Sequence, residues 1–69
     1  MTGSAAPGKP DRSLEKALGT QIRAVRRDLD LSIADLASAA GISTGMLSKI
    51  ENGGISASLG TLQAISGVL

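Results

Sequence analysis

The chain has 69 residues and a net charge of +1, and it contains no cysteine, histidine or aromatic residue. This length holds one small domain, and the missing residue types exclude a disulfide framework, a thiolate zinc site, a histidine base and an aromatic surface for stacking single-stranded bases. The carboxylates are scattered along the chain, and no apolar stretch approaches the roughly 18 residues of a membrane span. We therefore expect a cytoplasmic protein that is not an enzyme, binds no metal or cofactor and does not enter a membrane.

Residues 1–10 are small, polar and rich in proline and glycine, so we expect a disordered tail ahead of a folded unit at residues 11–69. An amphipathic helix is predicted from about Asp11 to Leu29, because apolar residues return there at steps of three and four. The residues expected on its inner face are Leu14, Leu18, Ile22, Val25 and Leu29. Gly19 lies inside this helix, where glycine costs about 1 kcal/mol relative to alanine. Its presence indicates that another backbone approaches closely.

Two short capped helices are predicted next. Ser32 is a good cap for a helix that ends at Gly41, a residue free to adopt the left-handed conformation of a turn. Ser43 caps a second helix that runs from Thr44 to about Asn52. The inward residues are expected to be Ile33, Leu36, Ala37 and Ala40 in the first helix, and Leu47 and Ile50 in the second, with Met46 at the margin. Two short helices joined by a glycine turn form a helix-turn-helix.

A fourth helix follows a loop from which Ile55 is expected to enter the core. Ser58 is its predicted cap. One side of this helix carries Leu59, Leu62, Ile65, Ser66 and Leu69. No stretch of the sequence alternates between apolar and polar residues as a strand does, so the sequence predicts an all-α fold.

The outer face of the predicted helix at residues 44–52 is short, polar and nearly free of negative charge. It carries Thr44, Gly45, Ser48, Lys49 and Asn52. The inward residues of the same helix hold it against its neighbour, so that this face is left free. Such a surface can enter a DNA major groove, which is about 12 Å wide.

The run LSIADLASAAGISTGMLSKIENG, residues 31–53, resembles the helix-turn-helix of the Xre/Cro/cI-type family of transcriptional regulators. Residues 18–27 are similar to the family's first helix and residues 56–62 to the start of its next one, so the likeness covers about residues 14–69. It implies a lambda-repressor-like bundle of four, at most five, short helices that binds double-stranded DNA, more often as a repressor. Members usually continue into further segments, and some carry a cupin domain, which a small-molecule effector would require.

The resemblance also implies a set of contact residues. Base contacts are expected from Thr44, Gly45, Ser48 and Lys49, and phosphate contacts from Ser32, Ser43, Asn52, Gly53 and Arg26. An ion pair between Arg26 and Glu51 is expected to orient the recognition helix. We interpret Arg23 and Arg27 as solvated helix charges, with phosphate contact as the less favoured alternative. Ile33 stands where the family often has glutamine, and its side chain cannot donate a hydrogen bond.

One recognition helix samples too few base pairs for useful specificity, so we expect a homodimer on half-sites about 34 Å apart. The fourth helix and whatever follows Leu69 are the expected dimerisation surface. The alternative is a protein-interaction or antitoxin-like helical module in which DNA binding is secondary or lost. The side chain of Ile33 and the low net charge keep this alternative open.

Overall fold

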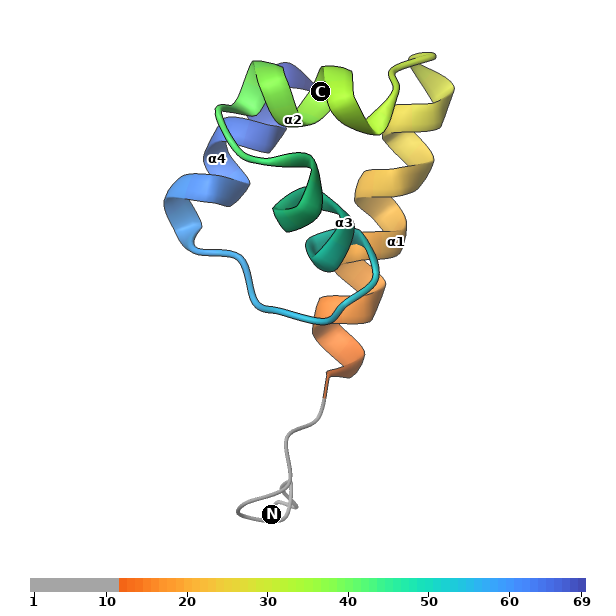
Figure 1. Ribbon diagram of the computed structural model, residues 1–69. Helices are drawn as coiled ribbons and strands as arrows, with labels where there is room; N and C mark the ends of the chain where they lie inside the picture. Colours follow the sequence, from red (N-terminus) through yellow and green to blue (C-terminus); the bar gives the residue numbers. More distant parts are fainter. Residues whose placement is uncertain (1–11) are drawn as a thin grey trace, which may run out of the picture.

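The computed structural model describes residues 12–69, and within them the chain forms four helices and no strand (Figure 1). The helices are α1 (Ser13–Asp28), α2 (Ile33–Ala40), α3 (Thr44–Glu51) and α4 (Leu59–Val68). This confirms the predicted all-α class and the place of each helix. No helix of the described range is long and apolar enough to cross a membrane.

The first helix is shorter than the sequence pattern predicts. Arg12 is its N-cap and Leu29 its C-cap, and Asp30 follows with a left-handed φ of 57°. The expected start at Asp11 and the expected tail at residues 1–10 lie outside the described residues. The left-handed residue turns the chain out of α1 and toward α2.

Serine side chains cap the other three helices. Ser32 forms a capping box, in which its hydroxyl oxygen accepts a hydrogen bond from the N–H of Asp35 at 3.0 Å and its own N–H donates to the Asp35 carboxylate at 3.2 Å. Ser43 and Ser58 accept hydrogen bonds from backbone N–H groups in the first turns of α3 and α4. Such caps are worth about 1 kcal/mol each. The predicted starts of these three helices are therefore confirmed.

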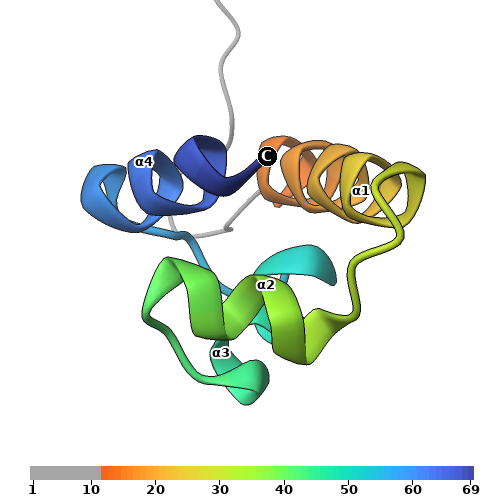
Figure 2. The ribbon, with the colours of Figure 1, turned by 90° about the horizontal axis from the view of Figure 1, so that it is seen from above.

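The helices surround one small aliphatic core. Figure 2 shows α1 and α4 side by side along one face of the domain, with α2 and α3 on the other side of the core. α3 packs against α1 and α2, and α2 also packs against α4. The buried core residues are Ile22, Leu36, Ala37, Leu47, Ile50 and Ile65. Ile42 and Ile55 pack against this core from the two loops that flank α3, and the contact of Ile55 agrees with the sequence prediction.

The apolar side of α1 is less buried than expected. Ile22 is buried, but Leu14, Leu18, Val25 and Leu29 are all exposed, with Leu14 at 77%. The prediction that the whole stripe faces the core is wrong, because α4 does not close over α1. The same holds on α4, where Ile65 is buried while Leu59 and Ser66 are exposed.

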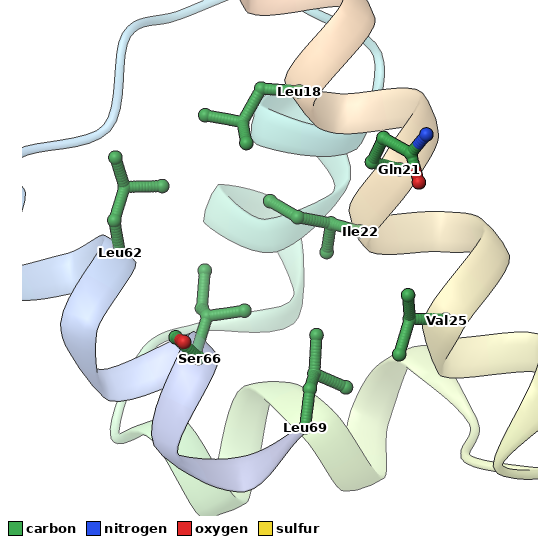
Figure 3. Close-up of a pocket in the computed structure, with 8 residues that line it drawn as sticks. Leu18, Gln21, Ile22, Val25, Leu62, Ser66 and Leu69 are labelled. Atoms are coloured by element: carbon green, nitrogen blue, oxygen red, sulfur yellow. The ribbon is translucent and has the colours of Figure 1, made fainter.

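Between α1 and α4 lies an apolar groove of about 390 Å³, which we call the α1–α4 groove (Figure 3). Leu18, Gln21, Ile22 and Val25 line it from α1, and Leu62, Ile65, Ser66 and Leu69 line it from α4 and its C-cap. In the close-up of the groove, α3 lies behind it. The groove therefore opens on the side of the domain that faces away from α3.

Gly19 allows α1 and α3 to approach closely. It is buried, and a Cβ atom at this position would overlap the backbone carbonyl oxygens of Ile50 and Glu51. The interpretation of this glycine as a point of close backbone approach is confirmed. The contact fixes the C-terminal end of α3 against the middle of α1.

We predict that Gly19→Ala lowers the free energy of unfolding by about 2 kcal/mol, because the backbone of α1 or α3 must move to admit the methyl group. The matched control is Gly60→Ala in α4, where no other part of the fold lies within 4 Å of the added atom. That variant is expected to gain up to about 1 kcal/mol from helix propensity. Urea denaturation followed by circular dichroism measures both changes, and a Gly19→Ala variant as stable as the control would contradict the close approach.

Candidate nucleic-acid interface

The two faces of α3 differ in burial. Leu47 and Ile50 are 0% and 3% exposed and hold the helix against α1 and α2. Thr44, Gly45 and Lys49 are exposed on the outer face, and Ser48 is half-buried. The outer face of α3 is therefore polar and accessible, while its inner face is fixed by the core.

Gly45 shows how open this outer face is. No other part of the fold lies within 4 Å of a Cβ atom built at this position, so the packing does not require glycine here. Met46, which the sequence placed at the margin of the core, is 42% exposed. The first turn of α3 thus presents a hydroxyl group, an open stretch of backbone and an apolar side chain to the outside.

Glu51 is the last residue of α3, and among the described residues it is the charged residue that is buried, with 3% exposure. Arg26 of α1 binds its carboxylate with two hydrogen bonds, from Nε to Oε2 at 2.8 Å and from Nη2 to Oε1 at 3.1 Å. This paired geometry is the strong form of an arginine–carboxylate interaction. Arg26 and Glu51 thus form the ion pair that the family resemblance implies.

Arg26 makes a third bond, from Nη1 to the carbonyl oxygen of Leu31 at 2.9 Å. One guanidinium group therefore joins α1, the turn before α2 and the end of α3. The hydrogen bonds to Glu51 raise the pKa of Arg26 above its usual value, while burial acts in the opposite direction and the attraction of the carboxylate adds to the rise. Because a raised pKa favours the protonated form, this contribution to stability is complete at neutral pH and is lost only as the pH rises through the pKa of Arg26.

Arg23 belongs to the same network, and its interpretation as a solvated charge was wrong. Its Nη2 donates to Oδ1 of Asn52 at 2.6 Å, and its Nε donates to Oε1 of Glu51 at 3.4 Å. The sequence did contain a signal, because Arg23 precedes Arg26 by three residues and helical residues at that spacing share a face. The partner in Asn52 could not be read from that spacing.

The serine caps leave donors available at two helix starts. Ser32 and Ser43 are exposed, and each hydroxyl oxygen accepts a cap bond from the backbone. The hydroxyl proton is not used in that bond and can be donated to an anion. Each hydroxyl also lies at the positive end of a helix dipole.

Gly53 has a different role from the expected phosphate contact. It is buried, and its N–H donates to the carbonyl oxygen of Ile50 at 3.1 Å. The N–H of Asn52 is likewise used, in a bond to the carbonyl oxygen of Ser48 at 3.0 Å. At the C-terminal end of α3, the donor that is available to the outside is therefore the side-chain amide of Asn52, which is exposed.

We predict that Arg26→Met lowers the free energy of unfolding by about 3 kcal/mol, because it leaves a buried carboxylate without its main partner. Arg27→Met is the matched control, since Arg27 is the exposed neighbour on the same helix and its loss should change stability by less than about 0.5 kcal/mol. Urea denaturation at neutral pH compares the two variants. Equal stability of the two would show that Glu51 does not depend on Arg26.

The geometry agrees with a comparison against known families. A family model described as helix-turn-helix matches residues 22–69, more than half of the chain, and this range includes α2, α3 and α4. A comparison with curated proteins found no match. On the strength of the family match, the chain belongs to the Xre/Cro/cI-type helix-turn-helix family of DNA-binding regulatory domains.

Proposed function

We propose that this domain reads sequence in double-stranded DNA by placing α3 in the major groove, as part of a transcriptional repressor. The observation that carries the proposal is the contrast between the two faces of α3. Leu47 and Ile50 fix the helix in the core, while the opposite face is polar and accessible. A rigid helix with such a face is what direct readout of base edges requires.

Base contacts are assigned to the outer face of α3. The residues are Thr44, Gly45, Ser48 and Lys49. Thr44 can bond to a base edge or touch a thymine methyl group, and Lys49 can reach the O6 and N7 acceptors of guanine. Gly45 lets the backbone approach the bases closely, because it has no side chain in the way.

Phosphate contacts are assigned to donors around α3. The residues are Ser32, Ser43, Asn52 and Arg26. The two serines lie at helix N-termini, where the dipole favours a negative group. Three of the five N–H groups of Arg26 are used inside the protein, so any phosphate contact falls to the other two. These contacts set the register of α3 on the duplex and give an affinity that depends on salt.

Selection from random double-stranded oligonucleotides tests the proposal, followed by titration of the selected site at several salt concentrations. The logarithm of the affinity should fall linearly with the logarithm of salt, with a slope of about 0.9 for each neutralised phosphate. Lys49→Ala should weaken binding by about 1–3 kcal/mol, the usual value of a good base contact. Gln21→Ala is the control, because Gln21 lies in the α1–α4 groove, away from α3.

A domain that selects no sequence, or that binds duplexes with an affinity independent of salt, would contradict this function. Equal affinity of the Lys49→Ala and Gln21→Ala variants would contradict the assignment of Lys49 alone.

We infer that two copies bind a two-fold operator, because α3 has only eight residues and meets few base pairs. We expect the two copies to contact each other through α4, where the side chain of Leu59 is 72% exposed. Pairing of two α1–α4 grooves is not expected, because it would direct the two α3 helices away from each other. Sedimentation of the protein with DNA carrying one or two half-sites about 34 Å apart measures the stoichiometry. Independent binding to the two half-sites would contradict the dimer.

A protein-interaction role is the second candidate, and the α1–α4 groove is the observation that favours it. The groove is lined mainly by leucine, isoleucine and valine side chains on the face away from α3. If this were the main role, the salt titration would show no selective DNA binding, and substitutions on α3 would have no effect on the partner.

A further inference from the structure

We propose that Arg23 is a positioning residue that fixes the side-chain amide of Asn52, so that the NH₂ group of Asn52 faces the phosphate backbone of the bound duplex. This inference deepens the proposed function and rests on it. Neither the spacing of residues in the sequence nor the family match assigns such a role to Arg23.

The distances show which contact of Arg23 is the stronger one. Its bond to Oδ1 of Asn52 is 2.6 Å long, whereas its bond to Oε1 of Glu51 is 3.4 Å long. Glu51 is already held by two shorter bonds from Arg26. The side chain of Arg23 is also 36% exposed, against 11% for Arg26. Arg23 is therefore the outer arginine of the network, and Asn52 is its principal partner.

This bond determines the direction of the amide. The oxygen and nitrogen of an asparagine amide lie on opposite sides of Cγ, and only the nitrogen carries donors. Because Oδ1 is turned toward the guanidinium group, Nδ2 is directed away from it. Asn52 is exposed, so its two N–H donors are available to an acceptor outside the protein.

The local charge also favours an anion at this place. The C-terminal end of a helix carries a partial negative charge of about half an electron, which by itself repels phosphate. Here the end of α3 carries two arginines against one carboxylate, so the network adds a net charge of +1. A phosphate group beside Asn52 therefore meets a donor in a positive environment.

The first test uses the protein without DNA. Asn52 is the single asparagine of the chain, so its side-chain amide gives one assignable pair of NMR signals. We expect an ordered amide in the wild type, with a ¹⁵N order parameter that falls in Arg23→Ala and stays unchanged in the control Arg27→Ala. Thermal unfolding of each variant shows whether the fold is retained. A retained fold with an amide of equal order in all three proteins would overturn the positioning role.

The second test is a double-mutant cycle on the selected operator. Arg23→Ala and Asn52→Ala should each weaken binding by about tenfold, the size expected for one hydrogen bond to a charged group. The double variant should bind only slightly worse than Asn52→Ala alone, because Arg23 acts mainly through Asn52 and its own charge adds only a screened attraction. The slope of affinity against salt should stay nearly unchanged in Arg23→Ala.

Two results on DNA would overturn the proposal. In the first, the losses of affinity in Arg23→Ala and Asn52→Ala add up, and the slope of log affinity against log salt falls by about 0.9 in Arg23→Ala. Arg23 would then itself be a phosphate ligand. An Asn52→Ala variant with wild-type affinity would show that no phosphate depends on the amide. A wild-type protein that binds no duplex would overturn the proposed function, and the NMR test would still decide separately whether Arg23 orders Asn52.

Discussion

The buried carboxylate of Glu51 is the constraint on which the position of α3 depends. A charge that is taken out of water needs a partner, and Arg26 provides two hydrogen bonds at the last residue of α3. The same guanidinium group bonds to the carbonyl of Leu31 ahead of α2, so one side chain holds three segments together. Gly19 adds a steric fit at the same end of α3. The position of α3 is thus fixed by a charge pair and by backbone contact at once.

This fixation matters because α3 is short. A helix of eight residues is not stable by itself in water, so its order comes from its cap and from the core. Ser43 satisfies the start of the helix, and Leu47 and Ile50 anchor its inner face. The net charge of +1 for the whole chain gives no indication of DNA binding. The relevant charges are local, and the arginines around Glu51 place them beside the exposed end of α3.

Much of the fold could be predicted from local signals in the sequence. The serine caps and the glycine turn define the starts of α2, α3 and α4, because capping chemistry acts within a few residues. The exposure of Leu18 and Val25 could not be predicted, because periodicity shows which side of a helix is apolar but not what covers it. The partner of Arg23 lies 29 residues away, and the N–H of Gly53 is used inside the helix end. The first fact depends on a tertiary contact that no spacing in the sequence records, whereas the second is a local turn bond whose geometry becomes visible only in the structure.

The open space around Gly45 has a consequence for how such a domain changes its target. A new side chain at this position meets no other part of the fold, so its effect on packing is small. Thr44 and Lys49 lie on the same exposed face, apart from the residues that hold α3 in place. Under the function proposed above, substitutions here would alter which bases are recognised while the scaffold stays intact. If α3 reads DNA as proposed, it could acquire preferences for different operators through single replacements, without compensating changes in the core.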